Sequence, residues 1–347
     1  MTATRALRFW AHDIAIDLGT ANTLVWVAGK GLVVNEPSVV AFNKKSKKIV
    51  AIGEKAKQMI GRAPRQIEIS KPLVDGVVSD FEVTEQMLRY FIDKVHKIHR
   101  VAWPRPRIII GLPSGVTEVE QRAVEEAARS AGARRIYLIE EPIAAAIGSG
   151  LDVLGNGGHM VVDIGGGTTE IAVMSVGGVV ALKSLRIAGD ELTESVQQHI
   201  RDEYGVQIGE QTAENLKTAI GAVYVHADPK IETVRGRNVI SGLPMQIEIS
   251  SDLLRIPLMK QTRPIIDAVK AALEEAPAEL IGDIMQSGIV LTGGGGLIAG
   301  MDHLVRQETK IDTTIGENAL TAVVEGAAKV LEQLDEYRRV LLSEMKG

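Results

Sequence analysis

Two stretches of the chain share one pattern, in which an apolar run, a turn of small residues and a second apolar run follow one another. They span residues 14–27 and 160–173 and align position for position, so that Asp17 corresponds to Asp163 and Gly19 to Gly165. Runs rich in Ile, Val and Leu on both sides of a short turn predict β-hairpins. Because the hairpin occurs twice, the pattern indicates a chain of two similar halves.

A second pattern, a buried-type strand that runs through a turn into a helix, also occurs twice. Residues 108–114 lead to a helix from about Glu118, and residues 289–296 lead to a helix from about Leu297. Strands that alternate with helices predict the α/β class, here with a mixed β-sheet and flanking helices in each half. We expect one domain over residues 1–150 (small subdomain about 32–70) and one over residues 151–318 (small subdomain about 188–249).

The remaining periodicity predicts most of the other elements. Apolar spacing of three and four residues indicates helices, and shorter apolar runs indicate strands. A Thr-x-x-Glu capping box formed by Thr117 and Glu120 opens one helix, and Asp190 is the expected N-cap of another. The expected helices are 54–61, 81–100, 117–131, 143–150, 191–204, 212–220, 264–275 and one long helix over 319–345, with strands within 31–53 and 231–249.

Composition narrows the function classes. At 347 residues the chain is long enough for about two domains. The net charge of −5 gives no reason to expect a nucleic-acid partner. The absence of cysteine excludes disulfides and cysteine-based metal sites and suits a reducing cytoplasm. No apolar run approaches the ~20 residues of a membrane span, and the N-terminus lacks the apolar core of a secretory signal.

The repeated hairpins carry the candidate chemistry. Small residues in each turn leave backbone N–H groups accessible, and such turns bind phosphate; the turns are Gly19, Thr20, Ala21 and Asn22, and Gly165, Gly166, Gly167 and Thr168. Asp17 and Asp163, at the ends of the preceding strands, are suited to hold a hydrated Mg²⁺. Either hairpin alone is equally consistent with an ordinary turn, but two halves that face each other would place both loops around one cleft.

Several segments together resemble a known family. The quoted motifs are residues 17–23, 35–38, 75–78, 140–146, 163–170 and 291–295. They are similar to those of the actin, Hsp70 and sugar-kinase superfamily, and more specifically to the MreB family, the bacterial actins of rod-shaped cells. The resemblance covers the chain from about Asp13 to the last helix. It implies an actin-like fold with a nucleotide in the interdomain cleft. It also implies that residues 319–347 belong to the first domain.

The resemblance also implies a role for individual residues. The two turns would hold the β- and γ-phosphates of ATP, and Asp17 and Asp163 would bind Mg²⁺ largely through water. Gly293, Gly294, Gly295 and Gly296 would approach the α-phosphate and base; most family members have Ala or Ser in place of Gly296. Glu214 and Lys217 would contact the nucleoside, and a surface ion pair that contributes little to stability is the alternative.

The same resemblance suggests a slow ATPase coupled to polymerisation. Hydrolysis requires an oriented water more than covalent chemistry. Glu141 is the candidate to orient it, with Thr168 and Asp17 assisting; the alternative for Glu141 is an acid favoured by the dipole at a helix N-terminus. Thr193 stands where family members often have Asp, so the site around Thr193 matches the family pattern only in part.

Two segments suggest a membrane contact. Residues 1–12 form a basic stretch with Leu7 and Trp10 on one helical face and Phe9 outside it, and a loop with Val101 and Trp103 is surrounded by arginines. Basic amphipathic segments lie at membrane interfaces. Packing of these residues on the protein body is the alternative. Four lysines in residues 44–48 are best interpreted as a solvated turn, with contact to lipid headgroups as the alternative.

The sequence therefore predicts a filament-forming, ATP-dependent, membrane-associated bacterial actin homologue that organises cell-wall synthesis and rod shape. Its expected partners are copies of itself, an anionic membrane surface and membrane proteins of the cell-wall elongation machinery. The expected location is the cytoplasmic face of the cell membrane. A soluble ATP-dependent small-molecule kinase or an Hsp70-like ATPase of the same superfamily is the alternative, although no phosphoacceptor pocket or additional substrate domain is recognisable.

Overall fold

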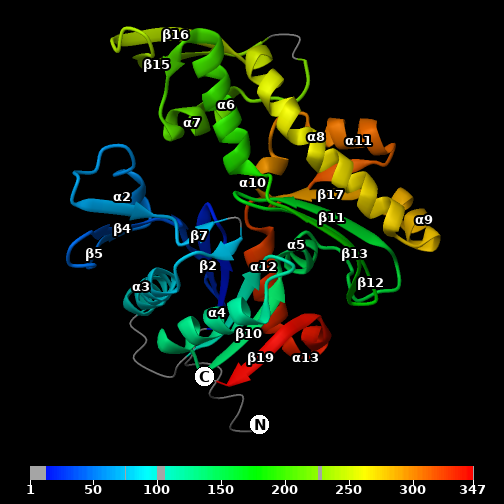
Figure 1. Cartoon of the computed structure of the whole chain (residues 1–347). Helices are drawn as coiled ribbons and strands as arrows, with labels where there is room; N and C mark the ends of the chain where they lie inside the picture. The colour runs from blue at the N-terminus through cyan, green and yellow to red at the C-terminus, as the bar shows by residue number, and fades with distance from the viewer. Residues whose placement is uncertain (1–12, 75, 100–105, 226–228, 347) are drawn as a thin grey trace. The chain divides into compact units, whose positions relative to one another are not determined.

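The computed structural model describes residues 13–74, 76–99, 106–225 and 229–346, except for the side chains of residues 96–99 and 346. They form two compact units (Figure 1). Unit 1 comprises the described residues up to Gly157, Met174–Val179 and the segment from Leu320, and unit 2 comprises Gly158–Val173 and Val180–Ala319. Each unit has a hydrophobic core of its own. None of the described helices is long and apolar enough to cross a membrane.

The main sheet of unit 1 has six strands in the order β19-β10-β9-β1-β2-β3. Strand β1 pairs with β2 antiparallel and with β9 parallel. Apolar runs are expected where a strand is covered on both faces, and β1 and β9 are almost entirely buried. The strands are β1 Ile14–Leu18, β2 Asn22–Val27, β3 Gly31–Pro37, β9 Arg107–Leu112, β10 Arg135–Glu140 and β19 Leu341–Lys346.

The helices of unit 1 are α2 Glu54–Lys57, α3 Phe81–His99, α4 Glu118–Ser130, α5 Glu141–Gly148, α12 Ala322–Glu332 and α13 Leu334–Tyr337, followed by a 3₁₀ turn over Arg338–Val340. The capping box of α4 is confirmed, because Thr117 Oγ1 accepts from Glu120 N at 3.3 Å and Thr117 N donates to Glu120 Oε2 at 2.8 Å. A small sheet with the order β5-β4-β6 and a two-stranded ribbon complete the unit; they comprise β4 Val40–Asn43, β5 Ile49–Ile52, β6 Ile67–Ser70, β7 Leu73–Val74 and β8 Val77–Val78.

The main sheet of unit 2 has the order β13-β12-β11-β17-β18, in which β11 is parallel to β17 and β17 to β18. The order matches β3-β2-β1-β9-β10 of unit 1, as the repeated sequence pattern predicts. A three-stranded sheet, β14-β15-β16, forms the insertion. The strands are β11 His159–Ile164, β12 Thr169–Ser175, β13 Gly178–Leu185, β14 Val206–Gln207, β15 Ile231–Asn238, β16 Pro244–Ser250, β17 Ile289–Thr292 and β18 Thr313–Ile315.

The helices of unit 2 are α6 Gly189–Tyr204, α7 Glu210–Ile220, α8 Ser251–Glu275, α9 Ala278–Ser287, α10 Gly293–Gly296 and α11 Met301–Thr309. Helix α8 begins thirteen residues before the expected start at Pro264 and contains Pro257 and Pro264. The Ser250 side chain caps it by accepting from Leu253 N at 3.4 Å. The glycine run, expected as a turn before a helix at Leu297, is itself one short helix, and α11 starts only at Met301.

The single long helix expected over 319–345 is wrong. Helix α12 ends at Glu332, and residues from Leu341 form β19, which pairs antiparallel with β10. The outer edge of β10 would otherwise leave its backbone N–H and C=O groups unpaired, and β19 satisfies them. Pairing in the folded chain therefore overrides the local helical periodicity.

The expected N-cap at Asp190 is also wrong. Ala188 occupies the N-cap position of α6, and its backbone N donates to Glu191 Oε2 at 2.8 Å. Asp190 lies in the first turn, where its backbone N donates to Gly166 O at 2.7 Å. Backbone oxygens of the turn at residues 165–168 accept from the first N–H groups of α6, in place of the side-chain cap that the sequence pattern suggests.

Helices α5 and α12 of unit 1 approach so closely that only glycine fits at their contact. A Cβ on Gly326 would lie 1.8 Å from Ala144 O, whereas a Cβ on Gly282 in α9 would meet nothing within 4 Å. We expect Gly326→Ala to lower the free energy of unfolding by at least about 1–3 kcal/mol through overpacking. Gly282→Ala is the matched control and should raise it by up to about 1 kcal/mol. Urea unfolding of both variants checks this, and equal midpoints would contradict the described packing.

Candidate functional site

The first predicted phosphate turn lies between β1 and β2 and is held from one side by Ser38. Ser38 Oγ donates to Gly19 O at 2.6 Å and lies 2.9 Å from Thr23 Oγ1, while Ser38 N donates to Ala21 O at 3.0 Å. A Cβ on Gly19 would lie 2.7 Å from Asn22 O, so the turn needs glycine there. Ala21 and Asn22 remain exposed. The turn is thus fixed by its own chain and presents an exposed edge.

Two acidic residues of unit 1 meet near one glycine. Asp17 in β1 pairs with Gly111 in β9. A Cβ on Gly111 would lie 3.5 Å from Glu141 Cγ and 3.1 Å from Val323 Cγ1. The fold therefore brings Asp17 and Glu141, which are far apart in sequence, to the same end of the sheet. Any larger residue at position 111 would fill the space beside them.

Glu141 is the first residue of α5 and is only 7% exposed. It follows β10 directly, and Pro142 at the first turn suits a helix start because proline has no N–H to leave unpaired. The neighbouring Glu140 has a raised pKa because of burial, which a hydrogen bond from Ser114 partly offsets. A buried carboxylate at a helix N-terminus is compatible with both interpretations made from the sequence.

The second predicted phosphate turn, residues 165–168 between β11 and β12, is fastened to the start of α6. Gly165 N donates to Thr168 O at 2.9 Å within the turn, and Gly189 N donates to Gly165 O at 3.1 Å. A Cβ on Gly189 would lie 3.1 Å from Gly165 O. The sequence pattern points to Asp190 as an N-cap but assigns no role to Gly189, the residue before it.

Asp163 lies at the end of β11, opposite Thr292 at the end of β17. It is 7% exposed, and Thr292 Oγ1 donates to its Oδ1 at 2.7 Å. Burial raises the pKa of Asp163 to about 6, although the hydrogen bond from Thr292 acts in the opposite direction. A cation beside this carboxylate would restore the ionised form.

The glycine run packs directly on the end of β11. Gly293 has a φ of +76°, and its Cβ would lie 2.3 Å from Ile164 O and 2.9 Å from Asp163 Oδ1. A Cβ on Gly295 would lie 2.2 Å from Ile164 Cγ2. Both positions thus require glycine. Gly296 differs, because its Cβ would lie 3.4 Å from Leu291 Cβ, an ordinary contact, so a small side chain would fit at this position.

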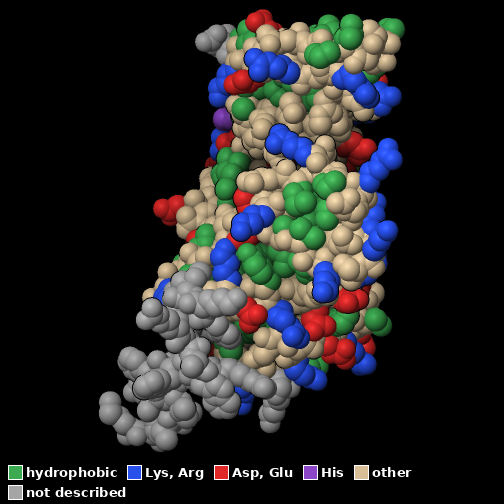
Figure 2. Space-filling model, turned by 90° about the vertical axis from the view of Figure 1, so that its left-hand side faces the viewer, with side chains coloured by type: hydrophobic (Ala, Val, Ile, Leu, Met, Phe, Trp, Pro, Cys, Tyr) green, Lys and Arg blue, Asp and Glu red, His purple; other side chains and the backbone are tan. Residues whose placement is uncertain are grey.

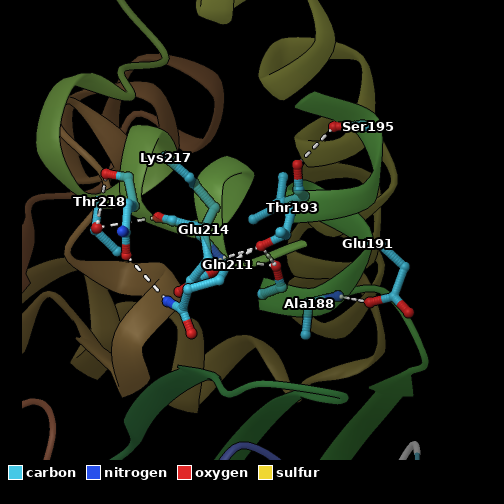
Figure 3. Close-up of polar contacts among 11 residues, drawn as sticks. Ala188, Glu191, Thr193, Ser195, Gln211, Glu214, Lys217 and Thr218 are labelled. Carbon is cyan, nitrogen blue, oxygen red and sulfur yellow. Dashed lines mark hydrogen bonds and ion pairs between the residues drawn. The ribbon is translucent and has the colours of Figure 1, made fainter. Parts of the chain in front are cut away.

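The buried Lys217 and the half-buried Glu214 form a network with the start of α6 rather than an exposed surface ion pair (Figure 3). Lys217 is 7% exposed, and its Nζ lies 2.6 Å from Glu214 Oε2. It donates to Gly189 O at 2.7 Å and to Thr193 Oγ1 at 2.9 Å. Thr193 also contacts Glu214 through its hydroxyl. Lys217 is therefore joined, through Gly189, to the turn at Gly165.

Other predicted site residues lie outside the described part of the chain. They are the candidate membrane residues Leu7, Phe9, Trp10, Val101 and Trp103, and Asp75 of the quoted motifs. Among the described residues, no group of three or more His, Cys, Asp or Glu side chains is arranged to hold a metal ion.

Comparison with known proteins decides the family. The MreB/Mbl protein family matches residues 11–339. The chain belongs to the MreB/Mbl family. It is 47% identical over 339 residues to the cell shape-determining protein MreB of Escherichia coli strain K12, covering 96% of this chain and 97% of that protein. It is 44% identical over 334 residues to the cell shape-determining protein Mbl of Bacillus subtilis strain 168, covering 96% and 100%.

Solved structures confirm the actin-like fold expected from the sequence. MreB5 of Spiroplasma citri bound to ADP superimposes with a TM-score of 0.89 at 36% identity, covering 94% of this chain and 98% of that chain. A chain of the MamK double helical filament superimposes with a TM-score of 0.79 at 22% identity, covering 93% and 99%. At 22% identity, the similarity to MamK shows a shared fold and nothing more.

Burial of Asp163 leads to a prediction for the free energy of unfolding. With a pKa of about 6 in the folded chain, above its ordinary 3.8, the folded state holds this proton more tightly than the unfolded state. The resulting stabilisation is complete below about pH 4 and is lost as the pH rises through about 6. Asp163→Asn cannot lose this stabilisation. As the pH rises from 4.5 to 7, its free energy of unfolding should therefore increase by about 1–3 kcal/mol relative to that of wild type. Urea unfolding at several pH values checks this, with Asp335→Asn as the exposed control; parallel curves would contradict it.

Proposed function

We propose that this chain binds Mg²⁺ and ATP through the turns of residues 19–22 and 165–168, and that it assembles into filaments that organise cell shape. The observation that carries the proposal is the repetition. In each unit a tight turn follows a strand whose penultimate residue is an aspartate, and this strand pairs with a parallel neighbour. Two structures of one relative support it, since MreB5 of Spiroplasma citri has been solved with ADP and with AMPPNP.

In this proposal the two turns hold the phosphates. The backbone N–H groups of residues 19–22 and 165–168 would bind the β- and γ-phosphates, because consecutive N–H groups in a tight turn form an anion-binding concavity. Gly293 to Gly296 would approach the α-phosphate and base. The requirement for glycine at positions 19, 293 and 295 keeps side chains out of that path.

The donor set fits Mg²⁺. Asp17 and Asp163 would hold the ion largely through water, because Mg²⁺ prefers oxygen ligands and keeps several waters. Burial disfavours the charge on Asp163 when the ion is absent. Cation and proton therefore compete for this carboxylate. When bound, the ion would neutralise charge on the phosphate oxygens.

Glu214 and Lys217 would contact the nucleoside, with Thr193 in support. The Lys217 ammonium is held in place by two oxygens besides Glu214, at Gly189 and Thr193. Where other family members have Asp, the Thr193 hydroxyl leaves Glu214 as the carboxylate that pairs with Lys217 in this network. The same Gly189 is bonded to the turn at Gly165, so the nucleoside side and the phosphate side share one scaffold.

Glu141 would orient the attacking water, assisted by Thr168 and Asp17. Its position beside Gly111, the residue that pairs with Asp17, supports this role over that of a simple helix-end acid. Slow hydrolysis to ADP and phosphate would then accompany polymerisation, since no covalent intermediate is needed and catalysis rests on positioning.

The cellular role is proposed from relatives named cell shape-determining proteins. Copies of the chain itself would be the main partner, together with an anionic membrane surface and membrane proteins of the cell-wall elongation machinery. Leu7, Phe9, Trp10, Val101 and Trp103 would insert into that surface from the cytoplasmic side. Basic segments with large apolar residues bind such interfaces.

The metal assignment predicts a Mg²⁺-dependent change in affinity. Asp163→Asn preserves size and removes the charge, so Mg·ATP should bind about 10–100-fold more weakly. Asp335→Asn, at an exposed site on α13, is the control and should bind like wild type. Calorimetric titration with Mg²⁺ and with EDTA checks this. Unchanged Mg²⁺-dependent affinity in folded Asp163→Asn would refute the metal site, and absence of ATP binding by wild type would refute the proposed function.

The catalytic assignment predicts that binding and hydrolysis separate. Glu141→Gln should bind Mg·ATP like wild type and release phosphate at least about 100-fold more slowly, because the base that orients water is lost. Its neighbour Glu140→Gln is the matched control and should keep most activity. Phosphate release from assembled protein is the measurement; wild-type rates in Glu141→Gln, or a loss confined to Glu140→Gln, would contradict the assignment.

A further inference from the structure

The small sheet of unit 1 has a charge opposite to that of the whole chain. Residues 38–71, which contain β4, β5, β6 and α2, hold nine Lys or Arg residues and two Glu residues, whereas the chain as a whole has a net charge of −5. The positive charge is therefore concentrated in one small part of an acidic protein. None of the proposed nucleotide-site residues lies in this segment.

The fold gathers most of this charge at one end of the small sheet. Asn43, the last residue of β4, pairs with Ile67, the first residue of β6, and Lys44 N donates to Gln66 O at 2.9 Å. The β4–β5 turn and the segment before β6 therefore lie side by side. Six exposed side chains, here called the basic rim, belong to these two turns: Lys44, Lys45, Lys47, Lys48, Arg62 and Arg65.

Of the two acids of this segment, Glu54 lies away from the rim and Glu68 lies beside it, so the charge at the rim stays positive. Glu54 follows Ile52, which pairs with Val40 at the opposite end of β4. Glu68 lies within β6, opposite Phe42. None of the salt bridges between described residues involves a rim side chain. Figure 2 shows the molecule from the left-hand side of Figure 1, where β4, β5 and α2 lie, and Lys and Arg side chains are spread across the middle of this view.

The lysine turn is held in one conformation. Asn43 Oδ1 accepts from Lys45 N at 3.0 Å and from Ser46 N at 3.1 Å, and Lys47 N donates to Asn43 O at 2.8 Å. Lys47 has a φ of +55°, a backbone conformation that glycine and asparagine adopt more readily than lysine. Its Nζ lies 5.1 Å from the centre of the Phe42 ring. A structured turn thus displays four lysine side chains, two on each side of Ser46.

The chemistry of the rim favours one kind of partner. Cores of protein interfaces are depleted in Lys, and proteins that bind single-stranded nucleic acid add exposed aromatic side chains for stacking. Phe42, the aromatic residue of this segment, is 8% exposed. An anionic bilayer needs neither shape complementarity nor stacking, because each basic side chain near its surface adds to the attraction independently. Val50 beside the lysine turn is 52% exposed and adds a small apolar contact.

We propose that the basic rim binds the anionic headgroups of a membrane surface. The inference rests on the membrane association proposed above and adds a contact that acts through charge, separate from the apolar residues near the N-terminus and residue 103. Each charge contributes a roughly fivefold increase in binding at low salt. Salt screens this contribution and leaves the apolar one.

The test is co-sedimentation of the full chain with vesicles of phosphatidylcholine and phosphatidylglycerol, and with phosphatidylcholine alone. The rim variant carries Lys44→Gln, Lys45→Gln, Lys47→Asn and Lys48→Gln; asparagine suits the positive φ of Lys47. The control variant carries Lys30→Gln, Lys230→Gln, Lys260→Gln and Lys310→Asn, which removes the same charge from exposed lysines elsewhere, one of them also at positive φ (+63°).

The rim variant should bind anionic vesicles at least about tenfold more weakly than wild type at low salt, with a shallower salt dependence, and the control should bind like wild type. Equal binding of rim variant and wild type, or equal losses in both variants, would overturn the inference. So would a loss of lipid-free sedimentation confined to the rim variant, because the rim would then be a contact between copies.

A third variant separates the inference from the proposal on which it rests. Trp10→Ala with Trp103→Ala removes the apolar contact and should abolish the binding that survives at high salt. If this variant alone loses binding, the membrane association stands and the rim inference fails. If wild type does not bind anionic vesicles at all, both fail. Thermal unfolding midpoints within a few degrees of wild type confirm that each variant is folded.

Discussion

The pairing register at the ends of the parallel strands is the constraint on which the candidate site depends. Asp17 stands opposite Gly111 in unit 1, and Asp163 stands opposite Thr292 in unit 2. A shift of one residue along either pair would turn the aspartate to the other face of the sheet. The apolar residues before each aspartate are buried and prevent such a shift, so the cores of the two units also fix their chemistry.

Backbone packing extends this constraint from the strands to the loops of unit 2. Gly293 and Gly295 lie against Ile164 at distances that exclude a side chain, and a Cβ on Gly189 would make a tight contact of 3.1 Å with Gly165 O. Lys217 and Thr193 then hold Gly189 through its carbonyl oxygen. A change at Lys217 or Thr193 would therefore be transmitted through hydrogen bonds to the turn of residues 165–168, which we propose binds phosphate. The burial of Asp163 adds an electrostatic reason for the site to bind a cation.

Much of this could be predicted from the sequence, because it depends on local pattern. The duplicated hairpins, the strand–turn–helix repeats and the capping box of Thr117 and Glu120 are each encoded within a few residues, and the folded chain contains them. The acids at the strand ends were recognisable for the same reason. The family resemblance extended the prediction to Glu141, Glu214 and Lys217, whose roles local pattern alone leaves open.

The parts that sequence reasoning missed depend on partners distant in the chain. Residues 341–346 follow a helical pattern and form a strand because β10 offers an unpaired edge. Asp190 is a residue type that often caps helices, yet it lies inside the first turn of α6 and its backbone N donates to Gly166 O. Ser38, Gly189 and Thr292 act through hydrogen bonds to loops far away in sequence. The basic rim likewise becomes visible only once β6 is paired with β4.

The central claim is that one nucleotide uses the loops of both units, and hydrogen–deuterium exchange with and without Mg·AMPPNP tests it most directly. The account predicts that saturation at one nucleotide per chain slows exchange together in residues 19–22, 165–168 and 293–296, and leaves residues 44–48 unchanged. Protection confined to one unit, or absent from these three segments in a saturated complex, would contradict it.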